Sequence, residues 1–139
     1  MRITPIEKED KTGRIITLRN AEISDADNLI TYMKITSFET PFLLREPDEF
    51  HLTSEQEECF IQNTIDNPRE LMLLATADGC HIGNCSLSDA GPFKRYQHRC
   101  QIAIALYQKY WGCGIGQMML STILSVAREL GYEQAELEV

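Results

Sequence analysis

Two different spacings of hydrophobic residues divide this chain into candidate strands and helices. Five segments are predicted to be strands, at residues 14–19, 71–77, 81–88, 100–106 and 134–139, and residues 71–77 form a continuous apolar run. Elsewhere apolar residues recur every three or four positions, which predicts three helices that begin near Ser24, Thr53 and Gly114. Residues 1–12 follow neither spacing and contain Pro5, so we expect a flexible tail there.

The order of these elements indicates the fold class. One strand is followed by two helices, then by three strands, a helix and a last strand. Asp78-Gly79 is a hairpin signal, so the strands on either side of it should be antiparallel. The final strand–helix–strand unit should instead be parallel. We therefore expect an α/β fold, a mixed, mostly antiparallel central sheet with flanking helices, in a single domain spanning residues 1–139.

The segment Trp111–Gln117, called the glycine turn below, is the first candidate for a binding site. It reads Trp-Gly-Cys-Gly-Ile-Gly-Gln, directly after a strand and at the start of a helix. Glycines at alternate positions let a ligand approach the backbone, because no Cβ intervenes. The first N–H groups of a helix and the positive end of its dipole favour phosphate. We predict that this turn binds the pyrophosphate of a nucleotide-like cofactor.

Charge and composition narrow the range of partners. The formal net charge is −8, which disfavours nucleic acid because phosphate binding needs a basic surface. No apolar run reaches the length of a membrane span, and no secretory leader is evident. Cys80, His81 and Cys85 lack the four-ligand spacing of a zinc site. We therefore expect a cytoplasmic protein with reduced cysteines and with no nucleic-acid, membrane or metal partner.

The order of elements and the glycine turn together resemble the GNAT superfamily of N-acetyltransferases, from Arg14 to Val139. The acyl-CoA motif of that family, Gln/Arg-x-x-Gly-x-Gly/Ala, corresponds here to residues 111–116, with Trp111 in place of the usual Gln or Arg. The resemblance implies acetyl-CoA as the cosubstrate and a contact between pantetheine and the end of the preceding strand. The implied cofactor-binding residues are Ala105, Leu106, Trp111, Gly112, Cys113, Gly114, Ile115, Gly116 and Gln117.

The resemblance also implies an enzyme that acetylates an amine of a small molecule or peptide by direct attack on the thioester. A backbone N–H near Leu106 is the candidate to polarise the thioester oxygen. The amine must first lose a proton, because a lysine-like amine has a pKa of roughly 10.4. Three residues are candidates for the base: His98, near the start of the cofactor strand, and Glu22 and Glu39, on segments that the family uses around the acceptor.

Members of that family continue beyond the strand that ends here at Val139. They add a helix and two strands, with a tyrosine that often serves as general acid. We therefore expect this chain to be C-terminally incomplete. A CoA-binding module or an inactive fragment is the alternative function, and a homodimer formed through the edge strand at residues 134–139 is a possible assembly.

Two other nucleotide-binding classes also place a glycine-rich turn between a strand and a helix. In an AdoMet-dependent methyltransferase, Glu138 would bind the ribose, but Tyr110 stands where an acid is usual. In a Rossmann domain, Gln117 stands where a glycine is needed. Both folds also require several further βα units after this turn, so both rank below an acetyltransferase.

Overall fold

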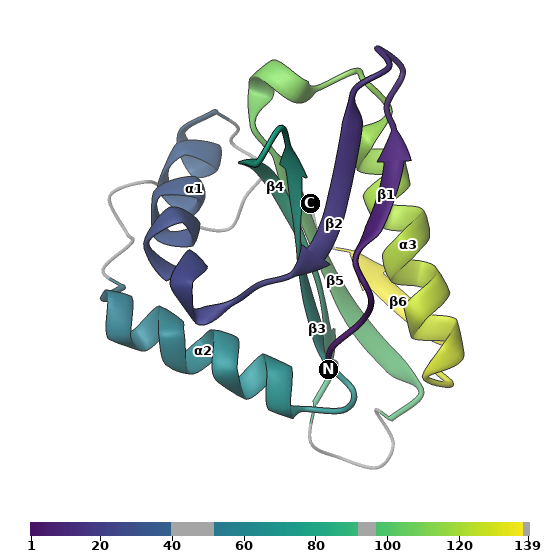
Figure 1. Cartoon of the computed structure of the whole chain (residues 1–139). Coiled ribbons are helices and arrows are strands. Elements are labelled where there is room, and N and C mark those ends of the chain that lie inside the picture. The colour runs from purple at the N-terminus through teal and green to yellow at the C-terminus, as the bar shows by residue number, and fades with distance from the viewer. Residues whose placement is uncertain (40–51, 92–96, 138–139) are drawn as a thin grey trace.

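The computed structural model describes residues 1–39, 52–91 and 97–137, and these form one six-stranded sheet with helices on both faces (Figure 1). The strands lie side by side in chain order, and every neighbouring pair is antiparallel except β5–β6. They are β1 (Ile6–Glu9), β2 (Ile15–Asn20), β3 (Leu71–Ala77), β4 (Cys80–Asp89), β5 (Arg99–Leu106) and β6 (Gln134–Leu137). The predicted mixed, mostly antiparallel sheet is confirmed.

Three α-helices flank the sheet, α1 and α2 on one face and α3 on the other (Figure 1). They are α1 (Ala26–Glu39), α2 (Ser54–Asp66) and α3 (Ile115–Glu129). Short 3-10 helices precede α1 and α3, at Ile23–Asp25 and Gln108–Tyr110. Within the three described ranges, no helix combines the length and hydropathy needed to cross a membrane.

Local sequence accounts for the central hairpin and for the start of α2. Every residue of β3 is buried, as expected for an uninterrupted apolar run. Asp78 and Gly79 have φ values of 52° and 79°, the backbone of a two-residue hairpin turn. The Gln56 N–H donates to the Thr53 hydroxyl, and the Thr53 N–H donates to the Gln56 side chain. Thr53-Ser54-Glu55-Gln56 has the sequence of a capping box, and these reciprocal bonds confirm it.

The start and the end of α1 differ from the sequence-based expectation. The 3-10 turn before it is capped by Glu22 and Asp25, rather than by Ser24. Asp25 also forms a two-point ion pair with Arg19, at 2.8 and 2.9 Å. Residues 36–52 contain Pro41 and Pro47, so the sequence predicts a loop or broken helix there. The helix instead continues to Glu39, and residues 40–51 lie outside the described residues.

The prediction of a flexible tail over residues 1–12 is wrong, because β1 pairs with β2 along its whole length. The Ile3 N–H donates to the side-chain oxygen of Asn20 at 2.8 Å, and the Asn20 amide donates to the Met1 carbonyl at 2.7 Å. In the sequence Ile-Glu-Lys-Glu of β1, only Ile6 is apolar. An edge strand with charged side chains carries too little hydrophobic alternation to be detected from the sequence.

The sheet is packed differently on its two faces. On the face under α3, Ile115, Met119 and Ile123 are fully buried in a continuous aliphatic core. The helical spacing of apolar residues after Gly114 predicts that Leu124 faces inward with Ile123, but this orientation of α3 leaves Leu124 40% exposed. The face under α1 and α2 has a smaller cluster that includes Leu29, and part of this face is not filled.

An irregularity in β4 shapes the sheet beside the glycine turn. The pairing of β4 with β3 shifts by one position, which leaves Ile82 as an extra residue in β4. The next residue, Gly83, faces Leu106 so closely that a Cβ on Gly83 would lie 2.4 Å from the leucine side chain. On the other side of β5, the described pairing with β6 ends at Ile102. The last part of β5 therefore has a strand partner on one side only among the described residues.

Candidate active site

The glycine turn joins β5 to α3 through two residues with left-handed backbone. Gly112 has a φ of 76° and Gly114 a φ of 82°, values that other L-residues adopt only with strain. Gly114 is the N-cap of α3, and the Met118 N–H donates to its carbonyl at 3.2 Å. The predicted arrangement of a strand, a glycine-rich turn and a helix is confirmed.

Six consecutive backbone N–H groups of this turn, those of residues 112–117, donate to no protein acceptor in the described part of the chain. The last three belong to the first turn of α3, where an α-helix offers no internal acceptor. The positive end of the helix dipole lies at the same place. Such a row of free donors is suited to the oxygen atoms of a phosphate or pyrophosphate group.

The hairpin between β1 and β2 covers one side of the glycine turn. The Lys11 N–H donates to the Cys113 carbonyl at 2.9 Å. The aliphatic stem of Lys11 lies against Gly114, where a Cβ would be 3.3 Å from it. Arg14 contacts the Cys113 sulfur at 3.4 Å. A hollow of about 380 Å³ lies between this hairpin and the start of α3, so the turn remains accessible from that side.

The end of β5 carries a backbone N–H that faces away from β4. The Tyr107 N–H donates to the Ile82 carbonyl on β4 at 3.0 Å. Because strand N–H groups alternate in direction, the Leu106 N–H points to the other side, where the described pairing with β6 has already ended. The Leu106 carbonyl accepts a hydrogen bond from the Trp111 indole at 3.0 Å, which connects the strand end to the glycine turn.

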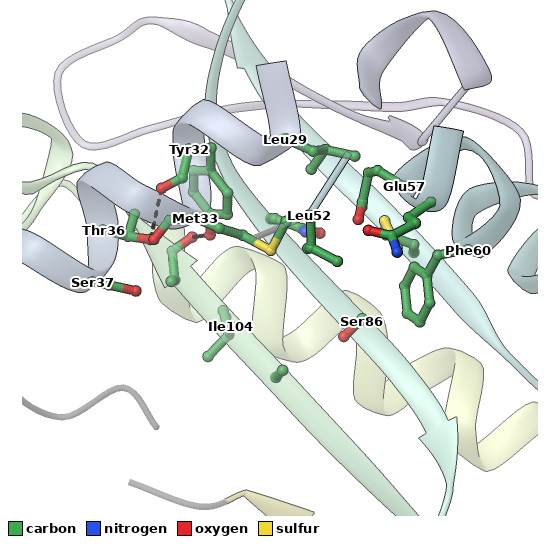
Figure 2. Close-up of a pocket in the computed structure, with 15 residues that line it drawn as sticks. Leu29, Tyr32, Met33, Thr36, Ser37, Leu52, Glu57, Phe60, Ser86 and Ile104 are labelled. Atoms are coloured by element: carbon green, nitrogen blue, oxygen red, sulfur yellow. Dashed lines mark hydrogen bonds between the residues drawn. The ribbon is translucent and has the colours of Figure 1, made fainter. Parts of the chain in front are cut away.

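A cavity of about 540 Å³ lies between α1, α2 and the sheet (Figure 2). Its floor consists of two cross-strand rows, Met72–Ser86–Ala103 and Asn84–Ala105. Small side chains in these rows leave space under the two helices. Its other lining residues are Leu29, Tyr32, Met33, Thr36, Ser37, Leu52, Gln56, Glu57, Phe60 and Ile104. Ala105 thus borders the cavity, while the next residue, Leu106, contacts the glycine turn.

Two acceptor groups of the cavity wall have no partner among the residues that the structure describes. Glu57 is 5% exposed, and its carboxylate forms no ion pair or hydrogen bond with a described residue. Burial raises the pKa of this carboxyl above its usual range. The Oδ1 atom of Asn84 is also buried without a partner. By contrast, the Tyr32 hydroxyl donates to the Ala105 carbonyl at 2.7 Å, and burial raises the pKa of the phenol.

The sequence alone did not point to Glu57, Asn84 or Lys11. Glu57 stands in the first turn of a helix, where acids are common on the surface. Its one signal is its spacing to Ile61 and Thr64, four and seven positions later, which places all three on one buried helix face. Asn84 and Lys11 have no comparable signal, because only the folded chain brings them to the site.

The three predicted bases lie far apart. Glu39 accepts a hydrogen bond from the Gln108 N–H at 3.1 Å and so lies beside the end of β5. His98 precedes the eight-residue strand β5, at the end opposite the glycine turn and roughly 26 Å away along the strand. Glu22 follows β2, three strands from β5, and a hydrogen bond from Arg2 lowers the pKa of its carboxyl. The structure brings only Glu39 near the predicted cofactor residues.

The sheet topology excludes the two other nucleotide-binding classes. Rossmann and methyltransferase folds are built on mostly parallel sheets, whereas here β5–β6 is the one parallel pair among the described strands. Glu138, the candidate ribose ligand in that interpretation, lies outside the described residues. No group of three His, Cys, Asp or Glu side chains in the described ranges is arranged to hold a metal ion.

Residues 16–139 match the acetyltransferase (GNAT) domain family. No curated protein sequence matches the chain. Among solved structures, an acetyltransferase of the GNAT family from Streptococcus pneumoniae is 28% identical and superposes with a TM-score of 0.81, over 88% of this chain and 73% of that one. The family match thus covers both the glycine turn and the cavity.

Two further solved structures share the fold at lower identity. A GNAT superfamily phosphinothricin acetyltransferase from Sinorhizobium meliloti, in complex with acetyl-CoA, is 20% identical with a TM-score of 0.76, over 88% of this chain and 64% of that one. The PaiA N-acetyltransferase from Thermoplasma acidophilum, in complex with coenzyme A, is 20% identical with a TM-score of 0.74, over 89% of this chain and 79% of that one.

Proposed function

Since this chain belongs to the GNAT acetyltransferase domain family, we propose that it transfers the acetyl group of acetyl-CoA to an amine of a small molecule or peptide. The observation that carries this proposal is the continuous row of free N–H groups at residues 112–117, which lies beside the end of β5 and its neighbouring cavity. A cofactor bound along that strand end would present its thioester to an acceptor in the cavity.

The pyrophosphate of acetyl-CoA binds to the N–H groups of the glycine turn. Trp111 and the Leu106 backbone border the path of the pantetheine arm, and Ala105 marks the point where the arm meets the cavity. Two proteins of the same fold, from Sinorhizobium meliloti and Thermoplasma acidophilum, form complexes with acetyl-CoA and coenzyme A, which supports this choice of ligand. Lys11 adds a positive charge beside Gly114.

The reaction is a direct attack of the neutral amine on the thioester carbonyl carbon. A C–N bond forms, the C–S bond breaks, and the electron pair of that bond leaves with the sulfur of CoA. The Leu106 N–H donates to the carbonyl oxygen while that atom carries negative charge, which lowers the barrier. The amine loses one proton and the thiolate gains one, so no redox partner is needed.

Glu39 is the proposed base among the three residues predicted from the sequence. Its hydrogen bond with the Gln108 N–H supports this choice over His98 and Glu22, because it holds the carboxylate beside the end of β5. A water molecule between Glu39 and the amine would carry the proton, since Glu39 does not line the cavity itself.

The test is the release of free CoA thiol from acetyl-CoA in the presence of a panel of primary amines. Release that depends on the amine, together with the acetylated product in mass spectra, is the expected result. Acetyl-CoA binding with no release for any amine would support the alternative, a CoA-binding module. Failure to bind acetyl-CoA at all would contradict both functions.

A further inference from the structure

The carboxylate of Glu57 forms no ion pair or hydrogen bond with a described residue, and the proposed reaction does not use it. Removing a carboxylate from water without a partner is costly, so such a group usually serves a ligand or shifts its pKa. Glu57 is 5% exposed and lines the cavity rather than the outer surface of α2. Its neighbour in the helix, Glu55, is by contrast exposed and does not line the cavity.

The remaining lining of the cavity is apolar or neutral. Of the lining residues that the structure describes, Glu57 is the one with a charge. The side chains of Leu29, Met33, Phe60 and Met72 supply most of the hydrocarbon surface. Among the described residues, no lysine or arginine lines the cavity to neutralise the carboxylate. A ligand that fits this cavity should therefore have an apolar stem that contacts the walls and one positively charged group that pairs with Glu57.

Glu57 and the strand end lie at different ends of the cavity. Figure 2 shows Glu57 beside Phe60 at one end, with Thr36, Ser37 and Ile104 toward the other. The β5 residues along the floor run from Ala103 to Ala105, a length of about 7 Å, with Ala105 nearest the end of the strand. The group bound by Glu57 is thus separate from the amine that reacts near the end of β5.

We propose that the cavity takes an acceptor with two amines on an apolar stem, and that Glu57 binds the ammonium group that does not react. The proposal rests on the proposed function, because it names the class of acceptor for the same site. An ammonium group has three N–H donors and no acceptor, so it suits a carboxylate in a donor-poor pocket. The unpartnered Oδ1 of Asn84, next to Ala105 across the strands, offers an acceptor to the reacting amine at the other end.

Binding in the presence of free coenzyme A tests this proposal without turnover. Calorimetric titrations would compare hexane-1,6-diamine with hexan-1-amine, which has the same stem and one amine fewer. A charged hydrogen bond is typically worth 1.5–3 kcal/mol, so we expect the wild-type protein to prefer the diamine by about tenfold or more. Glu57→Gln should bind both amines within about threefold of each other, because its amide cannot pair with an ammonium charge.

Two variants control for folding and for overall charge. Glu55→Gln removes one negative charge from the exposed side of the same helix turn, so it should keep the diamine preference. Glu57→Asp retains the charge at the site and should restore part of the preference. Equal binding of the two amines by the wild-type protein, or an unchanged preference in Glu57→Gln, would overturn the proposal.

The outcomes also separate this proposal from the proposed function. Glu57-dependent diamine binding without thiol release from acetyl-CoA would refute acetyl transfer and leave the diamine site standing. Thiol release at equal rates with both amines would support acetyl transfer and refute the role of Glu57.

Discussion

The two faces of the sheet are formed by the same strands but differ in packing, because one face is filled and the other retains a cavity. Under α3, large aliphatic side chains such as Met119 and Ile123 meet the sheet and leave no exposed surface on these residues. Under α1 and α2, the sheet presents Ser86, Ala103 and Ala105, and a cavity remains. Strand β5 contributes to both faces, because its successive side chains point in opposite directions: Ile102 packs in the core under α3 and Ala103 lines the cavity.

This difference shows how the fold separates stability from chemistry. The filled face supplies the buried apolar area that holds α3 and its glycine turn in place. The open face buries less apolar area, and it contains the buried carboxylate of Glu57, which pairs with no described residue. The cofactor and acceptor sites proposed above meet at the end of β5, between the filled face under α3 and the cavity under α1 and α2.

The largest contrast should come from shortening one side chain on each face. Ile123→Ala on the filled face should lower the free energy of unfolding by about 2–5 kcal/mol, because it leaves a cavity in a close-packed core. Phe60→Ala on the open face should cost less than about 1 kcal/mol, because Phe60 is already 56% exposed. Urea titrations of the two variants would measure both values, and equal losses would contradict the comparison.

Filling the cavity on the open face should weaken binding of the acceptor amine and leave binding of acetyl-CoA unchanged. Ala103→Leu places a larger side chain in the cavity floor and should raise the KM for the acceptor amine by about tenfold or more. The Kd for acetyl-CoA should stay within about twofold, since Ala103 lies outside the glycine turn. Ala135→Leu, on the exposed surface of β6, is the matched control and should change neither value. A larger effect on acetyl-CoA than on the amine would place the cavity in the cofactor site.

The smallest expected effect is a pH dependence on the open face. Burial raises the pKa of Glu57, so the folded protein holds that proton more tightly than the unfolded chain does. Stability contributed by the neutral carboxyl is therefore present at low pH and is lost as the pH rises through the raised pKa. Glu57→Gln should thus be more stable than the wild-type protein at pH 8, by about 1.4 kcal/mol for each unit of the pKa shift. Near pH 4 the two should unfold at similar urea concentrations, and a constant difference at both pH values would contradict this account.

The sequence was most informative where one short stretch determines one feature. The apolar run of β3, the Asp78-Gly79 hairpin and the capping box at Thr53 were all predictable, because their causes lie within a few residues. The arrangement of strand, glycine turn and helix was predictable for the same reason. The pattern failed for β1, since Ile6 alone could not distinguish an edge strand from a tail.

The cavity was not predictable, because it depends on which residues meet across the sheet. Ser86 and Ala103 are ordinary small residues until the pairing of β4 with β5 places them side by side. Glu57 belongs to helix α2, and only the folded chain places its carboxylate in the same cavity as Ser86 and Ala103. His98 was a candidate base on residue type alone, and its position at the far end of β5 depends on the direction of the strand.

The central claim is that the glycine turn binds acetyl-CoA, and a calorimetric titration of three proteins tests it most directly. Gly114→Val and Gly131→Val each put a branched side chain on a left-handed residue, with φ values of 82° and 88° in the wild-type protein. Gly114 opens α3 against Lys11, while Gly131 follows the other end of the helix with no atom near its Cβ position. We expect micromolar binding by the wild-type protein, a loss of about tenfold or more in Gly114→Val, and wild-type affinity in Gly131→Val. Equal affinity of all three proteins, or no heat from the wild-type protein, would contradict the claim.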